Sequence, residues 1–167
     1  VAVKLHGSDL NVLAKTPTIR MNLRWALPHA DQVLTVSRPL ARLAEALGAP
    51  PGRTRVLIDG VDGALFHVRD RAAERAALGV EGKRVALFVG NLYREKGVLE
   101  LADAFDRLAA EAPDLHLYLA GQGPLRDALD ERARANPRLH VLGPRPHAEI
   151  ARWLGASDLL VLPSWAE

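Results

Sequence analysis

Hydrophobic positions along the chain follow two alternating patterns. Short apolar runs predict β-strands at residues 1–5, 32–37, 55–58, 85–89, 115–120, 139–142 and 159–162. Between these runs, apolar residues recur every three or four positions and predict helices at 18–27, 39–47, 72–78, 98–109, 124–135 and around 150–154. This alternation favours βαβ units, so we expect an α/β fold of Rossmann-like parallel sheets with flanking helices.

The predicted elements form two groups, separated by a polar, Arg-rich stretch. Residues 1–62 are expected to be the last part of one Rossmann domain, and residues 84–167 an incomplete second one. Residues 63–83 lie between them and are interpreted as an interdomain connection. Because the sequence begins within a predicted strand and ends in the loop after another, we expect a fragment, truncated at both ends.

The order of strands in the second domain determines which loops meet. In the common 3-2-1-4 order, strands 85–89 and 159–162 are neighbours at the topological switch point, where ligands bind in such sheets. The loop that starts at Gly90 and the loop at 163–167 would then border one crevice.

Composition excludes several classes of protein. Hydrophobic residues make up 49 % of the chain and charged residues 25 %, as in ordinary globular domains. The net charge is only +2 and aromatics are 5 %, which argues against a nucleic-acid platform. The absence of cysteine excludes disulfides and thiolate metal sites and is compatible with a cytoplasmic location. No HExxH or closely spaced Asp-x-Asp motif is present, so no metal is expected.

The segment from Gly90 to Gly97 has the strongest chemical signature. A buried strand ends at Gly90, and Asn91, Arg94 and Lys96 follow before the next helical pattern starts. Loop amides and the helix N-terminus carry partial positive charge, to which Lys96 adds a full charge. We interpret the segment as a site for a phosphorylated ligand; the alternative is a solvated lysine at a helix start.

Gly121-Gln-Gly123 follows the strand at 115–120 and opens the next helix. These glycines either let a ligand approach the backbone or simply form a tight turn. The first strand of this domain lacks the GxGxxG fingerprint, which argues against a nicotinamide dehydrogenase.

Two further candidates lie at strand ends. His6, in His6-Gly-Ser-Asp9, could donate to a ligand oxygen, or it could end the strand while Ser8 or Asp9 caps the next helix. Glu167 could accept hydrogen bonds from sugar hydroxyls, or it could be a simple exposed residue.

Taken together, these motifs resemble retaining glycosyltransferases of family 4, also called group 1, with the two-Rossmann-domain GT-B architecture. The matching segments are 6–9, 30–37, 59–62 with Phe66, 90–97, 120–125, 142–147 and 156–164 with Glu167. Their shared order and spacing over nearly the whole chain carry the resemblance.

The resemblance implies roles for individual residues. Lys96 would bind the donor diphosphate, Glu167 would be the first glutamate of a Glu-x7-Glu motif on the donor sugar, and His6 would reach that sugar from the acceptor-side domain. The predicted catalytic residues are thus His6, Lys96 and Glu167. The predicted donor-binding residues are Gly90, Asn91, Arg94, Lys96, Gly121, Gly123, Arg145 and Glu167, with the loop around Arg145 facing the nucleobase.

The resemblance also has departures. Asn91 stands where the family often has Arg, so one fixed cation is missing, and Asp59 stands where Asn is usual. The second glutamate of the motif would lie after residue 167.

The implied activity is sugar transfer from a nucleotide-sugar donor, with retention and without cofactor or metal, to an unidentified acceptor that is lipid-linked or part of the cell envelope. A cytoplasmic location with peripheral contact to the inner face of the membrane is compatible with this. We expect the fragment alone to be inactive. The alternatives are a sugar-nucleotide epimerase of the same architecture and a non-catalytic nucleotide-binding module.

Overall fold

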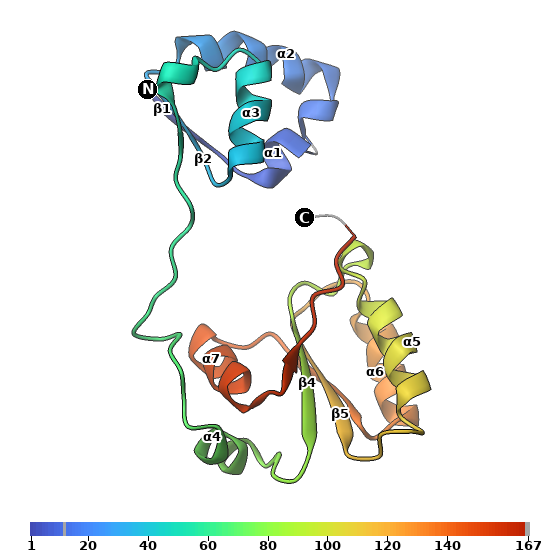
Figure 1. Cartoon of the computed structure of the whole chain (residues 1–167). Helices are drawn as coiled ribbons and strands as arrows, with labels where there is room; N and C mark the ends of the chain where they lie inside the picture. The colour runs from blue at the N-terminus through green and yellow to red at the C-terminus, as the bar shows by residue number, and fades with distance from the viewer. Residues whose placement is uncertain (12, 166–167) are drawn as a thin grey trace. The chain divides into compact units, whose positions relative to one another are not determined.

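The computed structural model describes residues 1–165 except residue 12. The chain folds as two compact units, one spanning Val1–Val61 and the other beginning at Asp62. Each unit contains its own parallel β-sheet covered by helices, as the sequence predicted (Figure 1).

The first unit contains a three-stranded sheet in the order β1-β2-β3, with all strands parallel. Its strands are β1 (Ala2–Leu5), β2 (Gln32–Thr35) and β3 (Thr54–Val56), and its helices are α1 (Gly7–Asn11), α2 (Pro17–Ala26) and α3 (Arg38–Ala46). Short 3-10 turns follow at η1 (Leu13–Lys15), η2 (Leu27–His29) and η3 (Pro51–Arg53). Helix α3 starts where the Ser37 hydroxyl accepts a hydrogen bond from the Leu40 amide at 3.4 Å. Leu40 and Ala44 then face the core on one side of the helix.

The second unit contains a four-stranded parallel sheet in the order β6-β5-β4-β7. Its strands are β4 (Arg84–Val89), β5 (Leu115–Ala120), β6 (Leu139–Gly143) and β7 (Leu159–Leu160). Its helices are α4 (Arg71–Leu78), α5 (Val98–Leu108), α6 (Arg126–Ala135) and α7 (His147–Ala156), and η4 (Arg94–Lys96) precedes α5. This is the order predicted from the sequence, and it makes β4 and β7 neighbours.

Helices cover both faces of this second sheet, which explains why its strands read as continuous apolar runs (Figure 1). Ala86 and Phe88 of β4 pack into the cluster that includes residues of α5 and α6. Val85 and Leu87, which alternate with them, pack into the cluster that includes Trp153 of α7.

The stretch expected to connect the domains, residues 63–83, contributes α4 to the second unit. The Asp70 carboxylate caps the start of α4 by accepting from the Ala72 amide at 2.9 Å. Glu74 of α4 accepts from Arg152 of α7 at 2.8 Å and from Arg69 at 3.1 Å. The ion pair between Glu74 and Arg152 therefore joins α4 to α7.

Several element boundaries differ from the sequence-based expectation. Helix α6 starts at Arg126 rather than at 124, because Leu125 turns back and its amide donates to Leu92 O at 3.2 Å. Helix α1 was not among the helices predicted from apolar spacing. Strands β3 and β7 are shorter than expected, and Ile58 and Leu162 beyond them are 77 % and 59 % exposed.

Within the part of the chain that the structure describes, no helix is both long and apolar enough to cross a membrane.

Candidate functional site

A depression of about 390 Å³ lies at the carboxyl ends of three strands of the second unit. Its lining residues come from the last residues of β4 and β5, from the turns after β4, β5 and β6, and from α7; they are Val89, Gly90, Asn91, Ala120, Gly121, Gln122, Pro144, Arg145, His147 and Ile150. Four of the predicted donor-binding residues, Gly90, Asn91, Gly121 and Arg145, are thus brought together. The carboxyl edge of a parallel sheet is where such folds bind ligands.

Main-chain hydrogen bonds tie the three turns together. The Gly90 amide donates to Ala120 O at 3.0 Å, and the Gly121 amide donates to Gly143 O at 2.9 Å. Farther along the loop, the Leu92 amide donates to Gln122 O at 2.8 Å. The hydrogen bonding of the sheet therefore continues into its loops, and main-chain hydrogen bonds hold the floor of the depression.

The two glycines after β5 are required by this loop packing. A Cβ at Gly121 would lie 1.8 Å from Gly90 O, and one at Gly123 would lie 2.6 Å from Leu92 O. Both distances are far below van der Waals contact, so no side chain fits. The structural interpretation of Gly121-Gln-Gly123, a turn packed against its neighbour, accounts for the glycines by itself; Gly121 also lines the depression, whereas Gly123 does not.

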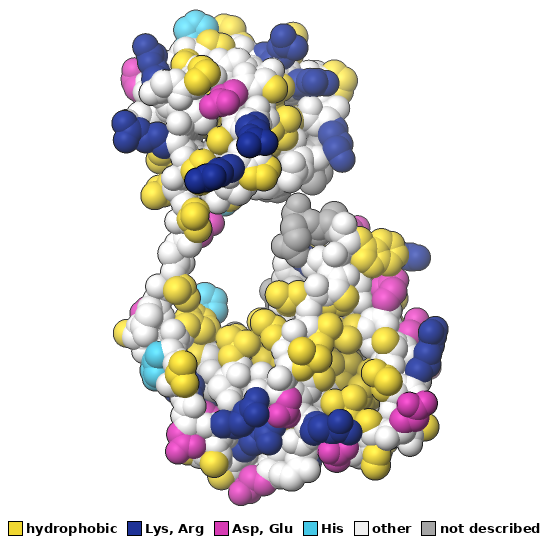
Figure 2. Space-filling model, viewed as in Figure 1, with side chains coloured by type: hydrophobic (Ala, Val, Ile, Leu, Met, Phe, Trp, Pro, Cys, Tyr) yellow, Lys and Arg dark blue, Asp and Glu magenta, His cyan; other side chains and the backbone are white. Residues whose placement is uncertain are grey.

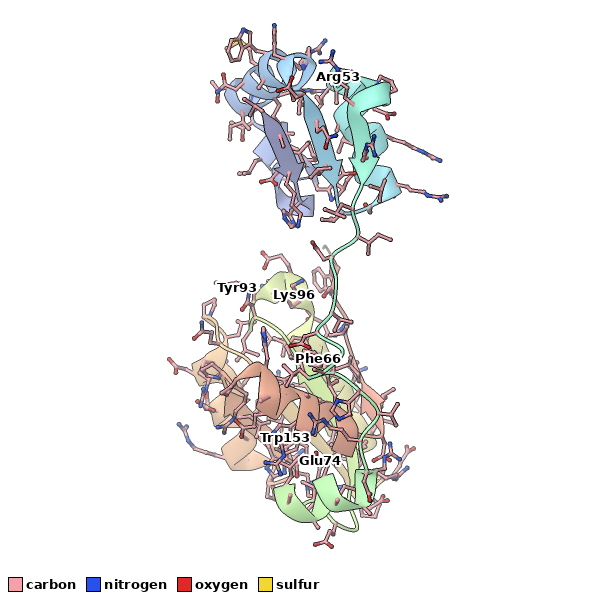
Figure 3. The ribbon with its side chains drawn as sticks, turned by 90° about the vertical axis from the view of Figure 1, so that its left-hand side faces the viewer. Arg53, Phe66, Glu74, Tyr93, Lys96 and Trp153 are labelled. Carbon is pink, nitrogen blue, oxygen red and sulfur yellow. The ribbon has the colours of Figure 1, made fainter. Side chains whose placement is uncertain are left out.

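Arg94 and Lys96 lie in η4, on the loop that joins β4 to α5, which places Lys96 at the N-terminal end of that helix. Figure 3 shows Lys96 and Tyr93 on this loop, above the carboxyl end of the sheet. Lys96 adds its charge to the partial positive charge of the first amides of α5. Neither Arg94 nor Lys96 is among the residues that line the depression.

The loop after β7 meets the η4 loop, as the strand order predicted. Gly97 has φ +65° at the start of α5, and a Cβ there would lie 2.3 Å from Pro163 O. The Trp165 amide donates to Glu95 O at 2.9 Å. Glu167, the predicted sugar-binding carboxylate at the end of this loop, lies outside the described residues.

Polar side chains border the depression at the start of α7. Arg145 and Glu149 form an ion pair with a 3.8 Å N–O distance, one helical turn apart. Phe66 packs near the His147 ring, with 6.3 Å between ring centroids. Gln122, Pro144, His147 and Ile150 were not proposed as site residues from the sequence. Gln122 and Pro144 lie just after predicted strands, and that position is a signal that could have found them.

His6 lies at the carboxyl end of β1 in the first unit. Its backbone amide donates to the Asp9 carboxylate at 2.8 Å, so Asp9 caps the start of α1. The His6 ring lies 4.0 Å from the carboxylate of Asp59, which also accepts from Lys4 at 2.9 Å. The hydrogen bond from Lys4 lowers the pKa of Asp59. The capping interpretation of this motif is therefore confirmed for Asp9.

A row of rings crosses β5 and β6 on the face that α7 covers. His116 Nδ1 and His140 Nε2 are 3.0 Å apart, and Tyr118 stacks on His140 with ring centroids at 4.4 Å. Trp153 of α7 lies against Tyr118 at 4.6 Å. Burial, together with the nearby His116 and Lys83, lowers the pKa of His140 to about 4. This histidine is thus neutral at pH 7 and forms part of the packing.

Among the described residues, no group of three or more His, Cys, Asp and Glu side chains is arranged to hold a metal ion.

Comparison with known proteins identifies relatives over most of the chain. Residues 83–167 match the family described as glycosyl transferases group 1. TuaC of Bacillus subtilis, named as a teichuronic acid biosynthesis glycosyltransferase, is 32 % identical over 98 % of this chain and 40 % of its own length. A D-inositol 3-phosphate glycosyltransferase of Mycobacterium tuberculosis is 33 % identical over 83 % of this chain and 30 % of its own. The chain thus spans less than half the length of these relatives.

Among solved structures, HepE of Anabaena in complex with UDP is similar, with a TM-score of 0.74 and 25 % identity over 98 % of this chain and 47 % of that one. The expected two-domain α/β architecture of GT-B glycosyltransferases is confirmed by this likeness. With the family match, the parallel-sheet fold and the glycine-bordered depression in agreement, the chain belongs to the group 1 glycosyltransferases.

Proposed function

We propose that the protein transfers a sugar from a nucleotide-sugar donor to an acceptor, with retention of configuration. The observation that supports this proposal is the loop after β4: its first residues, Gly90 and Asn91, line the depression, and Lys96 follows on the same loop at the start of α5. The similar HepE protein was solved with UDP, which supports a nucleotide as the bound part of the donor. A volume of about 390 Å³ lies in the range of small-molecule sites.

In this proposal the reaction depends on stabilising a departing nucleoside diphosphate. Lys96 and the first amides of α5 offset the negative charge that develops on it. Asn91, where an arginine would add a second charge, offers hydrogen bonds only, so Arg94 is the nearest additional cation in sequence. Arg145 and the turn around it bind the nucleobase, while His6 and Glu167 hold the sugar being transferred.

The proposal also covers the metal requirement, the acceptor, the location and the activity of residues 1–167. Because protein groups supply the positive charge, the reaction needs no metal. The acceptor is lipid-linked or part of the cell envelope, and the protein works in the cytoplasm with peripheral contact to the inner face of the membrane. Residues 1–167 alone are inactive, since less than half the length of the relatives is present.

The test is Lys96→Ala in the intact protein. Loss of a preformed charge at the diphosphate is expected to lower kcat about 10²–10³-fold and to weaken binding of nucleoside diphosphates in calorimetry. Lys83→Ala is the matched control, because Lys83 lies just before β4, at the end of the strand opposite the site. Its activity should match the parent protein, and both should be insensitive to EDTA.

Different outcomes separate this function from others. An unchanged rate in Lys96→Ala would refute the role of the lysine. Release of an epimerised nucleotide sugar without any acceptor would assign the protein to the epimerases. Binding of nucleoside diphosphates by the intact protein without turnover of any UDP-, GDP- or ADP-sugar would instead indicate a nucleotide-binding module.

A further inference from the structure

Strand β6 carries the turn that brings Arg145 to the depression. In the part of the chain that the structure describes, β6 lies at the edge of its sheet and pairs with β5 alone. This pairing is interrupted near its end, because the register shifts between Leu119 and Ala120. A side-chain contact between β5 and β6 therefore helps to fix the strand and the turn after it.

His116 of β5 and His140 of β6 provide such a contact. The Nδ1 atom of His116 and the Nε2 atom of His140 are 3.0 Å apart, within hydrogen-bond distance. Their ring planes are inclined by 11° and their centroids are 5.4 Å apart, so the two rings meet through these nitrogens. Tyr118 stacks on His140, and Trp153 of α7 packs on Tyr118, which holds the His140 ring in place. One side-chain hydrogen bond thus joins the neighbouring strands.

This bond tolerates one added proton but not two. A hydrogen bond between two imidazoles needs a proton on one of the facing nitrogens and a bare nitrogen on the other, whichever tautomers are assigned. A first added proton can go to a nitrogen that faces away, and the bond then becomes charge-assisted. A second added proton must occupy the bare facing nitrogen. Two donors and two like charges would then point at each other, and the strands would lose the contact.

The surroundings of the pair keep it neutral. Figure 2 shows Lys, Arg, Asp and Glu side chains along the end of the second unit at which β4 and β5 begin in Figure 1. Those that act on the pair are Lys83, Arg138 and Asp114, and Asp114 is itself paired with Arg84 at 2.6 Å. On the same face, β4 and α7 contribute apolar side chains such as Val85 and Trp153.

The pKa values of the three rings follow from these surroundings. Burial, followed by Lys83 and Arg138, lowers the pKa of His116. Burial, followed by His116 and Lys83, lowers the pKa of His140 to about 4. Burial raises the pKa of Tyr118, so its hydroxyl stays neutral. The closed pair therefore resists protonation at pH values where a solvated histidine accepts a proton.

We propose that His116 and His140 are a positioning pair, which holds β6 and the Arg145 turn in place and releases them in acid. Between about pH 6.5 and 4, separation of β6 from β5 lets the histidines bind protons that the closed pair refuses, so acidification favours this opening. The inference rests on the proposed function only in naming a nucleotide as the ligand that the turn meets. Opening of the strand is measured without any ligand.

The test is amide hydrogen exchange of the intact protein, expressed as protection factors at pH 7.5 and 5.5. A pKa of about 6.5 in the opened strand and about 4 in the closed one raises the opening equilibrium about tenfold between these pH values. The protection factors of the β6 amides and of the Arg145 amide should therefore fall about tenfold. They should also lie below those of β4 at both pH values, which would show that β6 opens by itself.

The decisive variant is His116→Asn/His140→Gln. Its side-chain amides stand where the facing nitrogens were and can form a hydrogen bond, but they do not titrate. Protection of β6 should match the parent at pH 7.5 and stay unchanged at pH 5.5. His140→Gln alone should show a smaller fall than the parent and serves if the double variant does not fold. The matched control is His67→Gln, an exposed histidine of the same unit, which should lose protection as the parent does.

UDP links the pair to the site. At 100 times its Kd, UDP should raise the protection of the β6 amides at least about tenfold, because a displaced turn cannot complete the depression. No fall in the parent, an equal fall in the double variant, or equal protection of β6 and β4 would each overturn the proposal, as would UDP that binds without raising protection. Failure of UDP to bind at all would instead refute the nucleotide site, and the pH comparison would still decide the role of the histidines.

Discussion

Replacing Gly97 by alanine tests how tightly the η4 loop is packed against the loop after β7. Gly97 has φ +65°, a left-handed conformation that costs other residues about 1–2 kcal/mol. A Cβ at this position would also lie 2.3 Å from Pro163 O and 3.0 Å from the Pro163 carbonyl carbon. Because these are backbone atoms, the contact can be relieved only by moving one of the two loops.

A second glycine of the same unit separates these two contributions. Gly79 also has φ +65°, at the end of α4, but nothing lies within 4 Å of the position of its Cβ. Gly79→Ala therefore incurs the conformational cost alone. Gly97→Ala incurs that cost plus an overpacking cost of about 1–3 kcal/mol. For a domain of this size, 1 kcal/mol corresponds to a shift in Tm of roughly 4–8 °C.

The assay is thermal and urea unfolding of the two variants beside the parent protein, followed by calorimetry with UDP. We expect the Tm of Gly97→Ala to lie at least about 4 °C below that of Gly79→Ala. Displacement of the η4 loop should also weaken UDP binding in Gly97→Ala and leave it unchanged in Gly79→Ala. Equal Tm values with unchanged UDP binding in both variants would show that the Pro163 loop is not held against Gly97, and would refute the reasoning.

Three further predictions concern stability. Burial lowers the pKa of His140 to about 4, so between about pH 6.5 and 4 the unfolded chain binds a proton on this residue and the folded chain does not. The free energy of unfolding should therefore fall with acidification through that window. His140→Phe should show a smaller fall in urea midpoints, and identical pH profiles of variant and parent would contradict this. Asp158→Ala removes the acceptor of the Val85 amide at 2.7 Å and should cost about 1–3 kcal/mol in urea unfolding, whereas a neutral effect would argue against that bond. Asp70→Ala removes the cap of α4 and should cost about 1 kcal/mol, which a parent-like Tm would disprove.

Local patterns were sufficient to predict the sheet of the second unit. Buried parallel strands such as β4 and β5 are continuous apolar runs, and the apolar spacing of α5 identifies the helix between them. The order of the strands followed from the usual topology of such units. Helix α1 could not be predicted in this way, because five residues are too few for a helical period to become visible.

Long-range pairing explains the other differences. Residues 63–83 were interpreted as an interdomain connection because they are polar and the partners of their charges lie far away in sequence, such as Arg152 for Glu74 and Ser157 O for Arg71. In the site, sequence alone could identify Gly121 as a special position. It could not show that the obstacle to a side chain is the carbonyl of Gly90, which only the folded sheet brings near.

The backbone floor of the depression has a consequence for how this site can change. The turns after β4, β5 and β6 are fixed by hydrogen bonds between main-chain atoms, including Gly90 to Ala120 and Gly121 to Gly143. The side chains that border the depression, such as Asn91 and Arg145, are not part of that support. In the function proposed above, mutations at these border positions would alter which nucleotide is preferred while the scaffold stays intact, so the same loops would offer a tolerant platform for evolving or engineering a new donor preference.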